Sequence, residues 1–264
     1  MISYCRALQA FAFLCVLSTG AWALPSRGDD YLSYTGTANA LRSHQFLYAE
    51  KHVLAEHDGK LAQRVVLYMC RNGAPFARKI VSYVDPLVPD FVVEDASDGM
   101  REGIRGDGRG RTVFFRAGSG EAEKSAVLPS VPGLVADAGF DEFLRANWQT
   151  LIADKELRIH FLIPSRLEDM GFWVEALRSE QIAGVPVDVF RLKLAGIFGW
   201  FLPGIDVYYG ASNHVLMRYV GLSDLRDASG DNFKVDISFD PKDRQPAGKD
   251  ALESALKATL APCT

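Results

Sequence analysis

Histidines are the first side chains in this sequence that could act in acid–base chemistry or bind a metal. His44, His52 and His57 lie close together, and His44 and His52 could share one face of a strand. No His-x-x-x-His pair on a predicted helix and no carboxylate at a diagnostic offset accompanies them. We interpret these histidines as surface or hairpin residues. The sequence predicts neither a metal site nor a cofactor.

Two glycine-containing segments resemble catalytic or phosphate-binding motifs in composition only. Residues 117–121 contain Gly-Ser-Gly, but they lack the G-x-S-x-G spacing between a strand and a helix that positions a serine nucleophile. Residues 106–111 have glycines at alternate positions, without the G-x-G-x-x-G spacing or the following helix of a dinucleotide-binding loop. Both segments are interpreted as flexible turns, and no catalytic residue is predicted.

Acidic side chains gather in residues 223–231, where oxygen ligands for a calcium ion could meet. Asp224, Asp227 and Asp231 do not have EF-hand spacing, so a solvated turn is the preferred interpretation. A pair of catalytic carboxylates assembled from separate loops stays open, because a sequence does not show which loops meet in space.

Residues 194–205 form a stretch without any charge, interrupted by Gly196, Pro203 and Gly204. Such a segment could cover a ligand site or touch a membrane surface. The alternative is a buried crossover that closes one end of a sheet. Four large apolar residues in it are predicted to line the mouth of a ligand site: Phe198, Trp200, Phe201 and Leu202.

The elements that must position these residues are mostly strands. Alternation of polar and apolar residues is clearest in residues 187–194 and 233–239, and a polar loop is predicted over 224–232. Turn signals separate the strands at roughly ten-residue intervals, as in antiparallel sheets. The other expected strands are residues 31–41, 46–56, 62–70, 76–84, 91–94, 100–105, 112–116, 156–163, 170–177, 205–209 and 215–220.

Two amphipathic helices are predicted, over residues 138–153 and 250–260. Asp137 is the expected N-cap of the first helix, and residues 117–132 before it are expected to be a loop. Phe143 and Trp148 lie on the apolar stripe of the first helix, where they would pack in a core or line a cavity. The predicted fold is therefore mainly β (α+β), with a strongly curved antiparallel sheet or half-barrel wrapping one or two helices.

The N-terminal residues have the pattern of a secretory signal peptide. Arg6 precedes an apolar run over residues 8–17, and Ala21-Trp-Ala23 resembles a cleavage site. The apolar run is shorter than the ~20 residues of a membrane-spanning helix. We expect cleavage near Ala23, a single β-rich domain over residues 24–264 and a periplasmic or secreted protein without a transmembrane anchor.

The cysteines indicate the cellular compartment of the protein, and its net charge limits the classes of binding partner. Cys70 and Cys263 lie outside the predicted signal peptide, and a pair of cysteines in an oxidising compartment is typical of a disulfide. Two free thiols are the alternative. The formal net charge of the chain is −4 at pH 7, which argues against nucleic acid as a partner because phosphate binding needs a basic surface.

The sequence also resembles exported bacterial proteins in residues 34–36 (Tyr-Thr-Gly), 160–166 (His-Phe-Leu-Ile-Pro-Ser-Arg) and 216–239. In architecture it is similar to the LolA/LolB/LppX-like lipoprotein and lipid carriers. That resemblance implies a curved sheet that encloses helices and an apolar cavity. It favours a non-enzymatic carrier of an apolar or amphipathic ligand such as a lipid. An envelope hydrolase or transferase, and a protein-interaction module of the envelope, are the alternatives.

Overall fold

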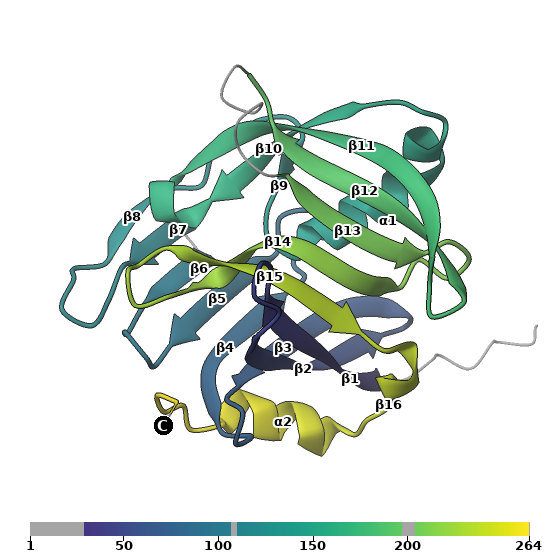
Figure 1. Cartoon of the computed structure of the whole chain (residues 1–264). Helices are drawn as coiled ribbons and strands as arrows, with labels where there is room; N and C mark the ends of the chain where they lie inside the picture. Colours follow the sequence, from purple (N-terminus) through teal and green to yellow (C-terminus); the bar gives the residue numbers. More distant parts are fainter. Residues whose placement is uncertain (1–28, 107–109, 197–203, 264) are drawn as a thin grey trace, which may run out of the picture.

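The computed structural model of the chain describes residues 29–106, 110–196 and 204–263 (Figure 1). Helix α1 (Gly139–Ile152) lies in the middle of the chain and helix α2 (Lys249–Lys257) near its end. Ahead of α1 are β1 (Asp29–Ala40), β2 (Phe46–His57), β3 (Lys60–Met69), β4 (Pro75–Ser82), β5 (Asp90–Asp95), β6 (Arg101–Gly106), β7 (Arg111–Arg116), β8 (Lys124–Val127) and β9 (Leu134–Val135). After α1 are β10 (Leu157–Ile163), η1 (Pro164–Arg166), β11 (Glu168–Ile182), β12 (Val185–Leu194), β13 (Ile205–Gly210), β14 (Leu216–Arg226), β15 (Asn232–Phe239), η3 (Pro241–Asp243) and β16 (Gln245–Pro246).

All of these strands belong to one 16-stranded sheet, in the order β8-β7-β6-β5-β4-β3-β2-β1-β15-β14-β13-β12-β11-β10-β9, with β16 beside β1. Most neighbours in the sheet are therefore also neighbours in sequence. The exceptions are two antiparallel pairings of β1. Its pairing with β15 joins the N-terminal meander to the C-terminal one, and its other non-sequential partner is β16. Strands β12, β13, β14 and β15 form an antiparallel meander, including the hairpin between β13 and β14.

The sheet curls until its two ends approach each other (Figure 1). The short helix η1, between β10 and β11, contacts β6 and β7. Leu162 of β10 is buried in the same apolar cluster as Ile104 of β6 and Val113 of β7. Within the described residues, strand pairing does not close the sheet. The fold is a half-barrel, which confirms the predicted fold class.

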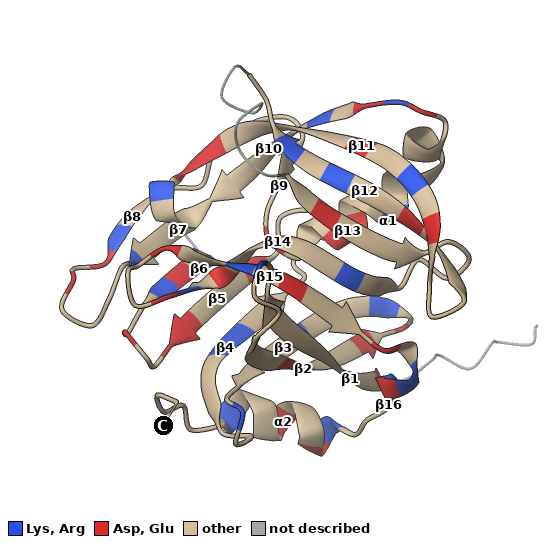
Figure 2. Ribbon diagram, in the orientation of Figure 1, with Lys and Arg blue, Asp and Glu red and all other residues tan. Residues whose placement is uncertain are grey.

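The two faces of the sheet carry different helices. Helix α1 packs inside the curve, against an apolar cluster that includes Ile159, Phe190 and Val207. Helix α2 covers the outer face of β2 and β3, on Val53 and Val65. Further along the outer face, basic and acidic side chains alternate across β12 to β15 (Figure 2). None of the described helices is long and apolar enough to span a membrane.

Two glycines permit close approaches that shape this half-barrel. Gly36 pairs with Phe239 where β1 meets β15, and a Cβ at this position would lie 2.3 Å from the Phe239 ring. Gly139 opens α1, and a Cβ there would lie 2.0 Å from the carbonyl oxygen of Leu87. A side chain at either position would push apart elements that are now in contact.

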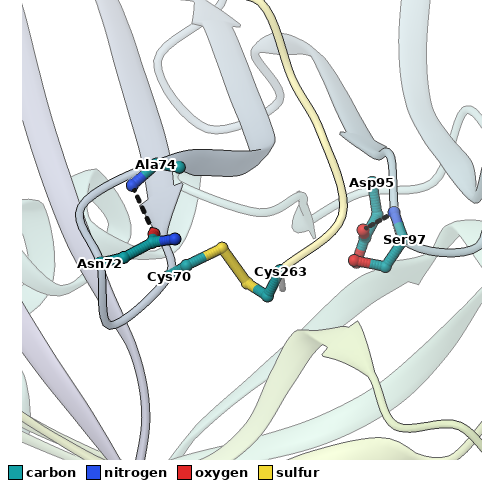
Figure 3. The surroundings of a disulfide bond; sticks show 6 residues. All are labelled: Cys70, Asn72, Ala74, Asp95, Ser97 and Cys263. Atoms are coloured by element: carbon teal, nitrogen blue, oxygen red, sulfur yellow. Dashed lines mark hydrogen bonds between the residues drawn. A yellow bond between two sulfur atoms is a disulfide. The ribbon is translucent and has the colours of Figure 1, made fainter.

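A disulfide joins Cys70, just after β3, to Cys263 near the C-terminus (Figure 3). This confirms the pairing predicted from the sequence. The backbone beside it is also attached to the sheet, because the amide of Ala261 donates to the carbonyl oxygen of Pro75 over 3.1 Å. The guanidinium of Arg78 donates to the Ala258 carbonyl over 3.2 Å. The covalent bond and these contacts fasten the segment after α2 to β4.

Two segments predicted as loops contain strand. Strand β8 lies within residues 117–132, where its exposed pattern at the sheet edge has no apolar alternation for sequence analysis to detect. Strand β14 continues to Arg226, so the predicted polar loop over residues 224–232 begins later than expected. The polar residues of that extension are explained by charged partners inside the half-barrel.

Candidate functional site

The concave face of the sheet holds charged side chains as well as apolar ones. Lys79 of β4 contacts two carboxylates, with its Nζ 2.5 Å from Oδ1 of Asp137 and in an ion pair with Asp224. The Lys79 and Asp137 side chains are only 13% and 6% exposed, whereas that of Asp224 is 36% exposed. Together with Glu102, these residues are called the central cluster. Asp224 is its contact with solvent.

Strand alternation explains why Lys79 points inward. Its neighbours at two positions before and after, Ala77 and Val81, are both fully buried in the core. Burial alone would lower the pKa of the Lys79 amine, but the carboxylates of Asp137 and Asp224 outweigh it and hold that pKa well above its usual range. Lys79 is therefore charged and paired.

Asp137 does not cap α1, so that prediction is wrong. Ala138 occupies the N-cap position without a side-chain hydrogen bond. Asp137 instead has a left-handed backbone conformation (φ 45°) and turns its carboxylate to Lys79. A buried amine without a counter-charge costs more free energy than a helix N-terminus without a side-chain cap. Pairing Asp137 with Lys79 is therefore favoured over capping α1.

Buried tyrosines surround the central cluster and supply neutral hydroxyl groups. The hydroxyl of Tyr68 donates to Oδ2 of Asp224 over 3.4 Å, and those of Tyr48 and Ser223 share a 2.7 Å hydrogen bond. Burial raises the pKa of both tyrosines well above the usual value, so both stay protonated. The cluster therefore contains fixed donors beside its carboxylates.

Glu102 of β6 is the buried acid of the central cluster and is only 8% exposed. Burial, followed by the negative charge of Asp224, raises the pKa of its carboxyl group to about 8. Glu102 is thus mainly protonated at neutral pH. The central cluster combines a neutral acid with an accessible carboxylate, Asp224.

A second group of charges attaches α1 to the sheet. Asp141, in the first turn of α1, accepts from Arg64 of β3 over 3.1 Å and from the hydroxyl of Tyr209 on β13. Arg145 forms an ion pair with Glu142 within the helix. Burial would raise the pKa of Asp141, but Arg64 and Arg145 outweigh it and lower that pKa. This helix anchor keeps α1 inside the curve.

The histidine prediction is right for two residues and wrong for one. His44 and His57 are exposed at hairpins. His52 is buried: its Nε2 lies 2.9 Å from Oε2 of Glu50, and its ring stacks on Tyr34 with centroids 4.4 Å apart. Burial lowers the pKa of His52, so the ring is neutral near pH 7. Side chains alternate between the two faces of a strand, and His52 lies on the face of β2 that points to the interior.

An apolar strip borders the concave face beside α1. The Phe161 ring centroid is 6.0 Å from that of Phe172 and 6.3 Å from that of Phe140 in α1. Tyr219 packs against both large apolar clusters and is also subject to the charges of the central cluster. The strip therefore leads through Tyr219 to Asp224. Its half-buried members are Leu157, Phe161, Phe172 and Ile205.

The predicted ligand-binding residues fall into two groups. Phe143 and Trp148 of α1 are buried behind the apolar strip, and the Trp148 ring stacks on His214 with centroids 3.8 Å apart. Their contact with a ligand stays a prediction. The predicted mouth residues lie outside the described residues: Phe198, Trp200, Phe201 and Leu202.

Two carboxylates of the acidic segment have partners within the protein. Asp224 pairs with Lys79, and Asp227 accepts from the backbone amide of Ser229 over 2.8 Å. Among residues 29–106, 110–196 and 204–263, no three His, Cys, Asp or Glu side chains are grouped so that they could hold a metal ion.

Sequence reasoning missed the central cluster, although one signal pointed to it. Lys79 and Glu102 each lie on a strand face where the residues two positions before and after are apolar. For Glu102 these residues are Met100 and Ile104. A charge in an apolar phase indicates a buried partner. The partners Asp137 and Asp224 come from distant segments and could not be identified by spacing.

Comparison with known proteins concerns the fold. No protein-family model and no curated protein matches the chain. A β-barrel-like DUF1849 protein from Brucella abortus has a TM-score of 0.40 at 10% identity, over 84% of this chain and 100% of that one. A DUF1329 protein from Desulfovibrio piger has a TM-score of 0.33 at 9% identity, over 89% and 93%. A putative outer-membrane lipoprotein-sorting domain from Vibrio parahaemolyticus has 0.27 at 8%, over 87% and 91%. A lipoprotein-sorting domain is thus among the similar structures, and likeness at this level assigns no activity.

Proposed function

We propose that this chain is a non-enzymatic binding or carrier protein of the cell envelope for an amphipathic ligand such as a lipid. The observation that carries the proposal is the continuity of the half-buried apolar strip, through Tyr219, with the partly exposed carboxylate of Asp224. An apolar surface that ends at charged and hydroxyl groups matches a ligand with a tail and a polar end.

The apolar strip would hold the tail. Each buried CH₂ group of a ligand contributes about 0.8 kcal/mol to the binding free energy. Several CH₂ groups packed against Phe161 and Phe172 therefore suffice for useful affinity. Phe172 pairs with Leu194, the last residue of β12. The uncharged segment with the predicted mouth residues therefore starts beside the strip.

The central cluster would hold the polar end. Asp224 accepts hydrogen bonds, and Tyr68 donates one from beneath it. Lys79 supplies a fixed positive charge that is already paired with Asp137 and Asp224. Such a site is suited to a headgroup that carries both donors and acceptors.

The cellular setting in the proposal is the envelope or the exterior. The Cys70–Cys263 disulfide is typical of proteins that fold in an oxidising compartment. The predicted signal peptide lies outside the described residues and stays a prediction. Its cleavage near Ala23 can be checked from the mass of the exported protein.

Titration with a fluorescent fatty acid tests the proposal. We expect saturable binding that is weakened at least ~10-fold by Phe172→Glu, because a carboxylate in the apolar strip opposes the tail. Trp173→Glu is the matched control, since the adjacent residue of β11 faces the other side of the sheet and should change little. Trp200→Glu tests the predicted mouth in the same assay. Binding that does not saturate, or an equal loss in the Phe172 and Trp173 variants, would contradict the proposal.

A second candidate is an envelope hydrolase or transferase, favoured by the two carboxyl groups of the central cluster. A protonated Glu102 in the same cluster as a second carboxyl group is the kind of pair that acid–base catalysts use. Glu102→Gln distinguishes the two functions. In a binding protein this isosteric change leaves ligand affinity within a few fold, whereas in an enzyme it abolishes turnover of an envelope lipid or polysaccharide.

A further inference from the structure

Arg244 is a half-buried arginine whose guanidinium has no ion pair with a carboxylate in the described parts of the chain. It follows η3, and its guanidinium carbon lies 3.9 Å from the centroid of the Tyr34 ring. Burial lowers the pKa of Arg244, and the positive charges of Arg64 and Arg145 lower it further. The guanidinium remains charged at neutral pH, so this end of the half-barrel carries positive charge that is not neutralised by a neighbour.

Two buried hydrogen-bond donors near Arg244 lack partners among the described residues. They are Nε of Arg64 and the hydroxyl of Tyr83. Arg64 as a whole is 9% exposed, and its Nη2 already binds Asp141. Burial raises the pKa of Tyr83, which therefore stays a donor. A buried donor without an acceptor costs about 1–3 kcal/mol, so an acceptor at this place would be stabilising.

Strand pairing brings these groups to the same end of the half-barrel. The amide of Tyr83 donates to the carbonyl of Ala62 over 3.0 Å, which places Tyr83 beside the start of β3 and close to Arg64. Tyr34 of β1 is paired with His52 of β2, and β16, which directly follows Arg244, pairs with β1 at Leu32 and Ser33. Arg64 on β3, Tyr83 just after β4 and Arg244 just after η3 therefore approach one region.

The charge balance of Arg244 and the helix anchor, taken together, is positive. Arg64, Arg145 and Arg244 contribute three guanidinium groups, and Asp141 and Glu142 contribute two carboxylates. The helix anchor uses Asp141 and Glu142 for Arg64 and Arg145. One guanidinium is left, together with two unpaired donors.

We propose that Arg244, Arg64 and Tyr83 form a binding site for a phosphate group. Guanidinium groups bind phosphate oxygens with paired, charge-assisted hydrogen bonds, and a phenol hydroxyl adds one more donor. Donors that approach from three elements suit a tetrahedral group better than a planar carboxylate. The phosphate belongs either to a lipid headgroup or to a free anion.

Calorimetric titration of the exported, disulfide-bonded protein with inorganic phosphate tests this site. We expect saturable binding that Arg244→Gln weakens at least ~10-fold, because one charge-assisted contact is lost. Tyr83→Phe removes only a hydroxyl group and should weaken binding ~5-fold without loss of the fold. Arg218→Gln is the matched control, an outer-face arginine whose loss should leave phosphate binding unchanged.

Comparison of a short-chain phosphatidic acid with the matching diacylglycerol, both below micelle formation, identifies the source of the phosphate. If phosphatidic acid binds more tightly than inorganic phosphate and the diacylglycerol does not bind, the phosphate belongs to a lipid headgroup. Equal affinity for phosphatidic acid and inorganic phosphate indicates a free anion. Both results support the site. Absence of saturable phosphate binding would overturn it, as would an Arg218→Gln effect equal to that of Arg244→Gln.

The phosphate site goes beyond the proposed function and can be separated from it. Phe172→Glu alters the apolar strip and should leave inorganic phosphate binding unchanged. Phosphate binding without fatty-acid binding would retain this site and contradict lipid carriage. Fatty-acid binding without phosphate binding would do the reverse.

Discussion

Charged pairs on the inner and outer faces of the same sheet differ in burial and in the segments that they connect. Inside, Lys79 and Asp137 are 13% and 6% exposed, and they join β4 to the segment that leads into α1. Outside, Arg191 and Asp206 are 39% and 14% exposed, and they lie directly opposite each other on the adjacent strands β12 and β13. The inner pair links distant parts of the chain, whereas the outer pair links strands that are already hydrogen-bonded.

The outer arginines also protect apolar surface. The guanidinium carbons of Arg218 and Arg178 lie 5.1 and 5.9 Å from the Tyr208 ring centroid. Val189 and Met217, next to that ring, are almost fully buried, although no residue of α1 or α2 belongs to their apolar cluster. Long arginine side chains can exclude water from an apolar patch while their charged ends stay hydrated. The arginines of the outer pairs are thus part of the surface, and their charges need less desolvation than that of Lys79.

The inner charges have lost most of their hydration, and their mutual attraction must offset that loss. Apolar residues of similar volume are often as good for stability as a buried ion pair. A cluster such as Lys79, Asp137 and Asp224 is therefore not explained by folding alone. The proposed role of the central cluster, holding the polar end of a ligand, would give these charges a function that an apolar core could not serve.

Lys79→Met should have the largest effect on stability. It leaves Asp137 buried without its counter-charge, and breaking a buried pair in this way reduces the free energy of unfolding by about 3–5 kcal/mol. Urea denaturation of the oxidised protein measures the change. Lys193→Met, which removes an outer-face lysine from Glu175 and Glu156, is the control and should lose less than about 1 kcal/mol.

A double variant sharpens this result. Lys79→Met combined with Asp137→Leu replaces the closest buried pair by apolar side chains and should recover much of the lost stability. If the double variant were as unstable as the sum of the single ones, the penalty would come from packing and not from an uncompensated charge.

The raised pKa of Glu102 makes the free energy of unfolding depend on pH. Its pKa is about 8 in the folded protein and 4.5 as the reference value, so between these values the folded state binds more protons than the unfolded state. The contribution of Glu102 to the free energy of unfolding is therefore complete below pH 4.5 and falls as pH rises to about 8. Within this window the slope is about 1.4 kcal/mol per pH unit.

Comparison with Glu102→Gln isolates this contribution. The glutamine variant lacks the titrating group, so the difference in unfolding free energy between the wild type and the variant should decrease steadily from pH 5 to pH 8. The buried His52 titrates in both proteins and cancels in the difference. A difference that stays constant with pH would show that Glu102 is ionised in the folded state.

Much of the fold was predictable because it is local. Alternation and turn signals located the meander, and the apolar stripe of α1 includes the buried Phe143 and Trp148. The disulfide was predictable because Cys70 and Cys263 are the two cysteines outside the predicted signal peptide. These features depend on neighbours in sequence or on simple counting.

The candidate site was not predictable for the opposite reason. Asp137 has the type and position of an N-cap, and only the three-dimensional fold shows that a buried lysine takes its carboxylate. Asp224 lies in a polar segment that reads as a loop, yet β14 extends through it. Both assignments depend on Lys79, which is far from them in sequence.

A double-mutant cycle on Arg191 and Asp206 should show the smallest effect and completes the comparison of the two faces. The guanidinium makes two contacts with the carboxylate, of 2.6 and 2.7 Å, but both groups adjoin solvent. We expect a coupling energy of about 1 kcal/mol or less, which decreases further when the salt concentration is raised. Urea denaturation of the two alanine variants and the double variant, at low and high salt, measures it. A coupling energy as large as the loss in Lys79→Met, and insensitive to salt, would mean that the outer pairs are desolvated too. The two faces would then differ in which segments their pairs connect and not in burial.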